Sequence, residues 1–151
     1  MPRFYFPRRA AIDVSLAIAA ACMSLPVFAD TPVTVTFEAR SVWAQEIGNV
    51  SHSGSAHDYT VAIAAGKTLQ LNLVTRNPNV YFKVKDQTHD KPLVDTSTTG
   101  ATTWSTPVVT ATTYTIHVYV DPDTIERGQD AKYALQIGQY GAEDLQPARP
   151  Q

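Results

Sequence analysis

The chain of 151 residues contains one cysteine, Cys22, and we expect that residue to be removed with an N-terminal signal. The mature protein would then have no disulfide, no thiolate nucleophile and no cysteine metal site, so its stability would depend on packing alone. The sequence also lacks a Gly-x-Ser-x-Gly elbow, a His-Glu-x-x-His motif and a phosphate-binding glycine loop. Without these motifs, catalysis has little support in the sequence, and we expect no enzyme activity, no cofactor and no bound metal.

Residues 1–29 have the layout of a secretory signal peptide. Three arginines lie within the first nine residues, residues 10–21 form an apolar run interrupted by Asp13, and small residues precede a cleavage site after Ala29. An apolar run of about twelve residues is too short to cross a bilayer. We therefore expect export, no membrane span and cleavage after Ala29. A lipid anchor at Cys22 is the less favoured alternative, because the position three before it lacks the usual leucine.

The mature chain, residues 30–151, has the length of one domain. We place that domain at residues 30–140 and a flexible tail at 141–151. Removal of the signal leaves nine basic and thirteen acidic residues, a formal net charge of −4. A mildly acidic chain without a Lys/Arg cluster does not favour nucleic acid or an anionic membrane as the partner.

Alternation of apolar and polar residues is the main structural signal. Two alternating runs, in residues 57–63 and 68–74, flank Gly66, which can adopt the positive φ of a tight reversal. We expect these runs to form a two-stranded hairpin with one apolar face that needs a partner sheet. The apolar positions are Tyr59, Val61, Ile63, Leu69, Leu71 and Leu73.

Further short strands are expected along the rest of the chain. Pro107 should lie at a strand edge or bulge, because proline lacks an N–H for a central ladder. No amphipathic helix is apparent, and the pattern predicts an all-β fold, an antiparallel β-sandwich of about eight short strands. The additional strands are expected at residues 33–37, 41–49, 80–86, 92–94, 104–109, 113–120 and 131–138.

The order of these features resembles the bacterial pre-peptidase C-terminal (PPC) domain family, which consists of small exported β-sandwiches. Within that group, it resembles the periplasmic inhibitors of g-type lysozyme of Gram-negative bacteria. The resemblance runs from Val33 through Tyr133. The segments that carry it are Asp58-Tyr59-Thr60-Val61, Ala65-Gly66-Lys67, Tyr114-Thr115-Ile116 and Lys132-Tyr133-Ala134-Leu135.

The resemblance implies a periplasmic protein whose partner is a lysozyme or a related peptidoglycan hydrolase. In several such inhibitors a Ser-Gly-x-Tyr loop enters the active-site cleft. Here only the tyrosine matches, as Tyr114, with Ala111 and Thr112 at the serine and glycine positions. Arg127, in an otherwise acidic loop, could bind a catalytic carboxylate bidentately. The expected contact residues are Thr110, Ala111, Thr112, Thr113, Tyr114 and Arg127.

A binding module for a glycan, cell-wall or protein partner is the alternative to lysozyme inhibition. Tyr81, His117 and Tyr119 are expected on the polar faces of their strands, where tyrosines bring a large contact area. They could equally be cross-strand pairs that cover the sheet. For Trp43 and Trp104, packing in the core or at an edge is favoured over a role as sugar platforms.

Two clusters of possible metal ligands have a simpler interpretation. His52, His57 and Asp58 could bind a metal or form a base with its orienting group, but their spacing is not a recognised one. The acidic loop at residues 121–130 could bind Ca²⁺, yet it lacks the spacing of an EF-hand. Solvated loops are the favoured interpretation of both.

Overall fold

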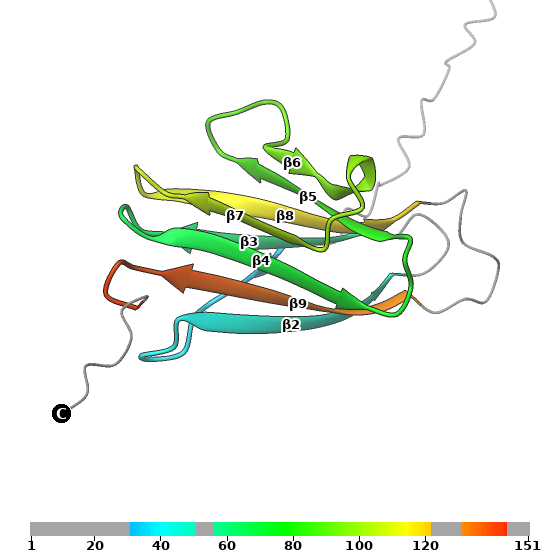
Figure 1. The fold of residues 1–151 in the computed structure, drawn as a ribbon, viewed down its shortest axis with the longest axis horizontal. Helices are drawn as coiled ribbons and strands as arrows, with labels where there is room; N and C mark the ends of the chain where they lie inside the picture. The colour runs from blue at the N-terminus through cyan, green and yellow to red at the C-terminus, as the bar shows by residue number, and fades with distance from the viewer. Residues whose placement is uncertain (1–30, 51–55, 122–130, 145–151) are drawn as a thin grey trace, which may run out of the picture.

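Two stacked β-sheets make up the part of the chain that the computed structural model describes, residues 31–50, 56–121 and 131–144 (Figure 1). One sheet has the strand order β1-β3-β8-β5-β6 and the other β2-β9-β4-β7. The described residues include one 3₁₀ turn, η1 (Thr96–Thr98), and no helix long and apolar enough to cross a membrane. The strands are β1 (Val33–Thr34), β2 (Trp43–Val50), β3 (His57–Ile63), β4 (Thr68–Thr75), β5 (Val80–Asp86), β6 (Val94–Asp95), β7 (Thr103–Pro107), β8 (Thr112–Val120) and β9 (Ala131–Tyr140).

The predicted β-sandwich is confirmed, and all but one of the strand pairs are antiparallel. The exception is β1, which lies parallel to β3. The expected first strand, residues 33–37, is shorter than predicted, although Val35 continues towards the core and donates its N–H to the Thr60 carbonyl oxygen at 2.8 Å. Pro107 ends the edge strand β7, where its missing N–H is tolerated.

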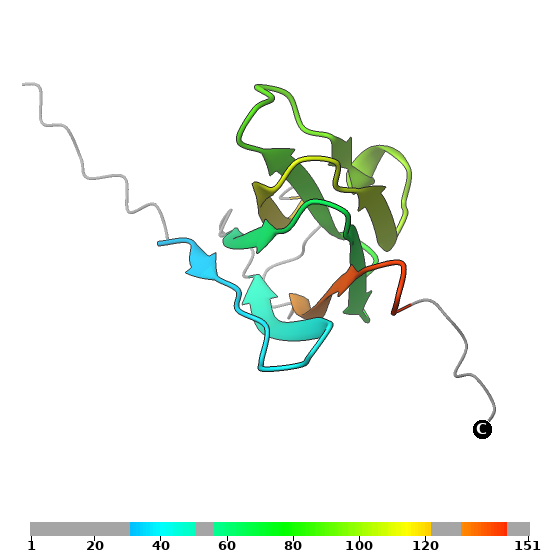
Figure 2. The same ribbon diagram turned by 90° about the vertical axis from the view of Figure 1, so that its left-hand side faces the viewer.

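The core lies between the two sheets, whose layers are viewed along the strands in Figure 2. Each long strand contributes alternate side chains to it, because successive residues of a strand point to opposite faces. Burial of each valine, leucine or isoleucine side chain stabilises the fold by about 1.5–3 kcal/mol. From β8 and β9 the buried residues are Tyr114, Ile116, Val118, Val120, Ala131, Tyr133, Leu135 and Ile137.

The expected hairpin between residues 57 and 74 is wrong, because β3 and β4 belong to different sheets. Gly66 does take a positive φ of 81°, but the turn carries the chain across the core rather than back along a neighbouring strand. All six alternating apolar side chains are buried as predicted. The alternation is the same in both arrangements, since two strands that face one core from opposite sheets show the same pattern as a hairpin.

The end of β9 is tied back to the body of the sandwich. The strand extends to Tyr140, and the Gly141 N–H donates to Asp144 Oδ2 at 2.6 Å. The Lys67 ammonium lies 2.7 Å from Glu143 Oε1 and 3.4 Å from Asp144 Oδ2. Residues 141–144, the first part of the expected tail, are therefore in contact with the β3–β4 turn.

Thr96 completes the hydrogen bonding of β5 where the short strand β6 ends. Its hydroxyl accepts from the Phe82 N–H at 2.9 Å and donates to the Phe82 carbonyl oxygen at 3.1 Å. Thr96 and Phe82 are both fully buried. The side chain thus takes the place of a neighbouring strand, and leaving these backbone groups without a partner would be costly.

Thr96→Val should lower the free energy of unfolding by about 1–3 kcal/mol, because the isosteric side chain leaves a buried N–H and carbonyl unpaired. Urea denaturation followed by tryptophan fluorescence measures this change. The control is Thr36→Val at an exposed position, where a change within about 0.5 kcal/mol is expected. Equal stability of the two variants would show that Thr96 does not have this role.

Candidate functional site

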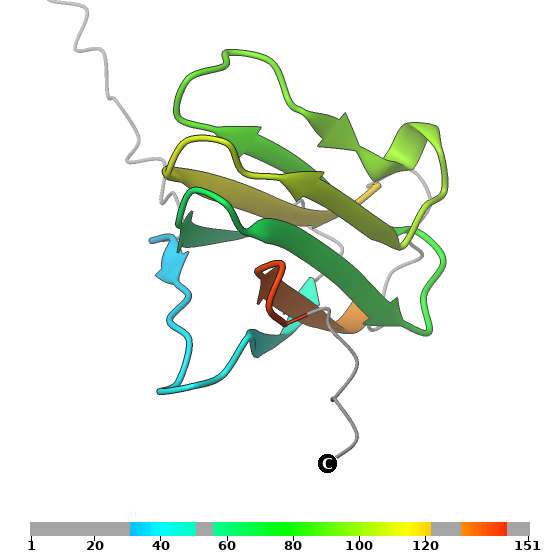
Figure 3. The same cartoon turned by 60° about the vertical axis from the view of Figure 1, so that its left-hand side comes forward.

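The connection between β7 and β8 projects from one end of the sandwich. Val109, near its tip, is 87% exposed, whereas the neighbouring Val108 is buried in the core. Figure 3 shows this loop beside the β3–β4 turn. Two hydrogen bonds join them: the Gly66 N–H donates to the Val108 carbonyl oxygen and the Val108 N–H to the Lys67 carbonyl oxygen, both at 2.8 Å. The loop therefore presents the exposed Val109 next to a residue, Val108, whose backbone is bonded to the β3–β4 turn.

The contact residues expected around this loop differ in exposure. Thr110 and Ala111 are exposed, while Thr112 and Thr113 are partly buried at the start of β8. Tyr114 is only 4% exposed and belongs to the core. Burial, with the nearby charge of Asp86 as a smaller cause, raises the pKa of its hydroxyl. The Tyr114 ring is therefore not available at the surface in this conformation, unlike the loop that precedes it.

Arg127 lies outside the described residues. The segment that contains it leaves β8 after Val120 and rejoins the chain at Ala131, whereas Thr112 begins β8 at its other end. A nine-residue strand is roughly 26 Å long from its first to its last residue. The two expected contact elements are thus attached at opposite ends of the same strand.

Tyr81, His117 and Tyr119 share the outer face of the five-stranded sheet and make cross-strand contacts there. Tyr81 and Tyr119 are direct partners in the β5–β8 register, with ring centroids 6.0 Å apart. His117 Nδ1 lies 2.5 Å from Asp58 Oδ1. The cross-strand pairing considered from the sequence is therefore present, and the three side chains remain partly exposed.

Tyr119 is the centre of a polar cluster on this face. Its hydroxyl donates to Asp95 Oδ1 at 2.6 Å, and the Lys83 ammonium lies 3.2 Å from Asp95 Oδ2 and 4.6 Å from the Tyr119 ring centroid. Burial, followed by the hydrogen bond to the Asp95 carboxylate, raises the pKa of Tyr119 to about 12. Burial alone would raise the pKa of Asp95, but hydrogen bonds from Tyr119, Ser97 and Lys83 hold it below its usual value.

His57 and Asp58 do not form a base and its orienting group. Asp58 faces outward to His117, whereas His57 Nδ1 lies 2.8 Å from the Tyr133 hydroxyl. That hydroxyl is 2.7 Å from the Tyr59 hydroxyl, and burial, then the hydrogen bond to Tyr59, raises the pKa of Tyr133. His52 and most of the acidic loop lie outside the described residues, among which no group of three potential ligands is placed to hold a metal ion.

Trp43 and Trp104 occupy different positions in the sandwich. Trp104 is partly buried and packs against the core, as expected, but Trp43 is 54% exposed on the outer face of the four-stranded sheet. Of the two expected positions, core or edge, Trp43 has the edge one: β2 is an edge strand whose inward positions are the even-numbered ones, ending at the buried Val50. Trp43 and Ile47 therefore face outward although they alternate with polar residues.

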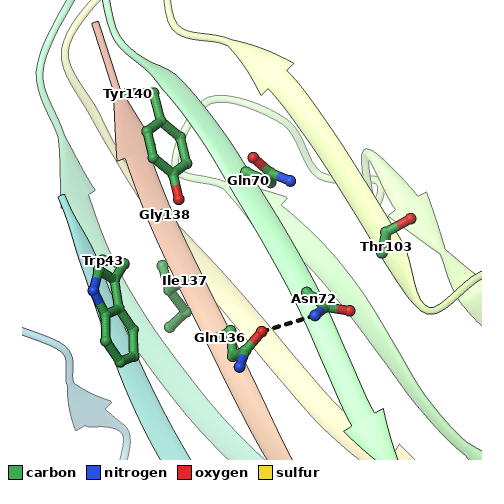
Figure 4. A pocket seen from close by; sticks show the side chains of 8 residues that line it. All are labelled: Trp43, Gln70, Asn72, Thr103, Gln136, Ile137, Gly138 and Tyr140. Carbon is green, nitrogen blue, oxygen red and sulfur yellow. Dashed lines mark hydrogen bonds between the residues drawn. The ribbon is translucent and has the colours of Figure 1, made fainter. Parts of the chain in front are cut away.

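A groove of about 360 Å³ lies beside Trp43 (Figure 4). The side chains around it come from all four strands of this sheet, and none of the residues that line it is charged. The sequence feature that could have indicated this groove is the glutamine and asparagine residues at outward positions of β4 and β9. The lining residues are Trp43, Gln70, Asn72, Thr103, Gln136, Ile137, Gly138 and Tyr140.

Replacement of Tyr119 by phenylalanine should lower the free energy of unfolding at pH 7 by about 1–2 kcal/mol, because Asp95 loses a hydrogen bond. Because the pKa of Tyr119 is raised on folding, this group stabilises the fold fully at pH values below about 10, the ordinary pKa of tyrosine. This contribution is lost as the pH rises towards 12. Because the pKa of Asp95 is lowered on folding, this group stabilises the fold at pH values above about 4, the ordinary pKa of aspartate. This contribution is lost as the pH falls through the pKa of Asp95 in the folded protein.

The difference between wild type and Tyr119→Phe should therefore be larger at pH 7 than at pH 3 or pH 11. Urea titrations at the three pH values measure it, with Tyr81→Phe on the same face as the control. A difference that stays constant with pH would contradict this account of the cluster.

Several solved structures are similar to this chain, although no protein-family model and no curated protein sequence matches it. The PliG inhibitor of g-type lysozyme from Aeromonas hydrophila has a TM-score of 0.62 at 21% identity, covering 73% of this chain and 96% of that one. PliG from Salmonella Typhimurium has a TM-score of 0.57 at 13% identity, covering 74% and 100%. The pre-peptidase C-terminal domain of a Bacillus anthracis collagenase has a TM-score of 0.51 at 10% identity, covering 71% and 94%. The chain therefore has the β-sandwich fold that these periplasmic inhibitors share with the PPC domain, as its sequence pattern indicated.

Proposed function

We propose that this protein is an exported, non-catalytic inhibitor of a peptidoglycan hydrolase, with a g-type lysozyme as the favoured target. The projecting β7–β8 loop is the observation that supports the proposal most directly, since it exposes Val109 next to Val108, whose backbone is bonded to the β3–β4 turn. The likeness to the PliG structures, over nearly their whole length, supports the same function. Residues 1–29 would direct the chain to the periplasm and be cleaved after Ala29.

Insertion of this loop into a cleft would be physically favourable. The hydrogen bonds between Val108 and the β3–β4 turn fix the residue next to Val109 before binding, which reduces the conformational entropy lost on association. Val109 would then be desolvated as an apolar anchor. The hydroxyls of Thr110 and Thr112 could donate to carboxylates, which glycoside hydrolases carry on either side of the scissile bond.

Tyr114 has a supporting role in this proposal, because its side chain is buried in the core at the start of the strand that follows the loop. Arg127 is the second proposed contact and would supply a charge-assisted hydrogen bond to a carboxylate. Its segment follows the end of β8, whereas the loop precedes the start of that strand.

Val109→Glu should raise the inhibition constant at least about tenfold, since it replaces an apolar anchor with a charge that carboxylates repel. Its melting temperature should change little because the side chain is exposed. The assay titrates purified residues 30–151 into g-type, c-type and invertebrate-type lysozymes acting on a cell-wall suspension. The matched control is Ile47→Glu, which places the same charge at a 76% exposed position on another face. Equal inhibition by the two variants would place the inhibitory surface elsewhere.

Tyr114→Phe should leave the inhibition constant within about twofold of wild type, because Tyr114 is only 4% exposed and offers a partner little surface. Arg127→Ala should weaken inhibition by about fivefold to tenfold through loss of one charged contact. The same lysis assay measures both. Loss of inhibition in a folded Tyr114→Phe variant would mean that the hydroxyl does reach the hydrolase.

A further inference from the structure

We propose that the groove beside Trp43 binds an uncharged oligosaccharide. This inference concerns a different surface from the β7–β8 loop and does not depend on the inhibitor function. Its basis is the arrangement of two aromatic rings and a row of side-chain amides on the outer face of the four-stranded sheet (Figure 4).

The strand register builds the aromatic part of the groove. Gly138 of β9 pairs with Trp43 of β2 on one side and with Gln70 of β4 on the other, so the three positions form one row across the sheet. Because Gly138 has no side chain, the row has a gap at its centre. The Tyr140 ring lies over this gap: a Cβ atom added at Gly138 would come within 2.4 Å of Tyr140 Cε2. The glycine thus allows Tyr140 and Trp43 to occupy the same end of the groove.

The next row consists of amides. Gln136 of β9 pairs with Gln45 of β2 and with Asn72 of β4. Asn72 Nδ2 donates to Gln136 Oε1 at 2.8 Å, and Gln136 Nε2 donates to Gln45 Oε1 at 3.5 Å. Each amide offers two N–H donors and an oxygen with two lone pairs, so these bonds use only part of their capacity. The chain orients the amides and leaves donors and acceptors for a ligand.

This combination matches the surface of a sugar. The C–H groups on one side of a pyranose ring are weakly positive and apolar, and they stack on the negative face of an indole or phenol. The hydroxyls at the ring edge exchange donors and acceptors with amides. None of the residues lining the groove is charged, so an ionic ligand would lose hydration without gaining a counter-charge. A volume of about 360 Å³ is within the range of small-molecule sites.

A protein partner is the main competing occupant of this face. Ile47 is 76% exposed and Val74 is 49% exposed, and both pair with Ala134 in the row next to the amides, on the side away from Trp43. These residues would be the centre of an apolar protein contact. The polar, amide-lined part around Gln136 would instead be poorly suited to such a contact, because every amide covered without a partner costs free energy. The sugar is therefore the occupant that the groove itself favours.

The test is binding of chitohexaose and cellohexaose, two uncharged β-linked oligosaccharides, to purified residues 30–151. Trp43 becomes the sole tryptophan in a Trp104→Phe background, because the sequence has two. Saturable quenching or a blue shift of its emission is expected with at least one of the sugars, with isothermal calorimetry as the second readout. Trp43→Ala and Tyr140→Ala, each in the wild-type chain and assayed by calorimetry, should weaken binding at least about tenfold.

Ile47→Ala is the matched control on the same face and should leave sugar binding unchanged. The proposal is overturned if neither sugar saturates the folded protein, or if Trp43→Ala binds as tightly as wild type. It is also overturned if Ile47→Ala weakens binding as much as Trp43→Ala, which would indicate an apolar docking face. Val109→Glu separates the two proposals, because it should lose lysozyme inhibition and retain sugar binding.

Discussion

Burial of two sheet faces against each other is the constraint on which the rest of the structure depends. With no cysteine in the described chain, the alternating apolar side chains of the long strands must supply the stability. The polar groups that enter this region are satisfied locally: Thr96 bonds to both backbone groups of Phe82, and the Tyr133 hydroxyl lies between His57 and Tyr59. Among the described residues, no buried side-chain nitrogen or oxygen lacks a hydrogen-bond partner. Because this core is complete in itself, the sequences of the loops and outer faces can vary without loss of the fold.

The projecting loop and the groove lie towards the same end of the sandwich. Thr68, beside the β3–β4 turn, pairs with Tyr140 on one side and with Pro107 on the other. Pro107 leads directly into the loop that contains Val109. If both proposals hold, a hydrolase bound at the loop would keep its polysaccharide substrate close to the groove. One small domain would then contact an enzyme and a glycan through neighbouring but separate surfaces.

Period-two alternation was sufficient to predict the β-sandwich, most strand positions and the burial of the residues in β3, β4, β5, β8 and β9. It could not predict that β3 and β4 lie in different sheets, because each faces the same core. It could not decide between a core and an edge position for Trp43, because the inward positions of the edge strand β2 carry small or polar residues before Val50. The groove depends on the β2–β9 and β9–β4 registers, which join residues distant in sequence. The same alternation correctly placed Tyr114 on the inner face of β8.

The sheet change at Gly66 has a consequence for how the chain folds. Of the strand pairs in the described structure, only β5 with β6 joins strands that are consecutive in sequence. The four-stranded sheet is assembled around the last strand, β9, so β2 and β4 have no common neighbour until residues 131–140 are available. Sheets closed by such distant pairings fold slowly, in milliseconds to seconds, because the loop entropy is lost before the contacts form. The domain would therefore remain largely unfolded until its final strand has been synthesised, a state compatible with passage through an export channel.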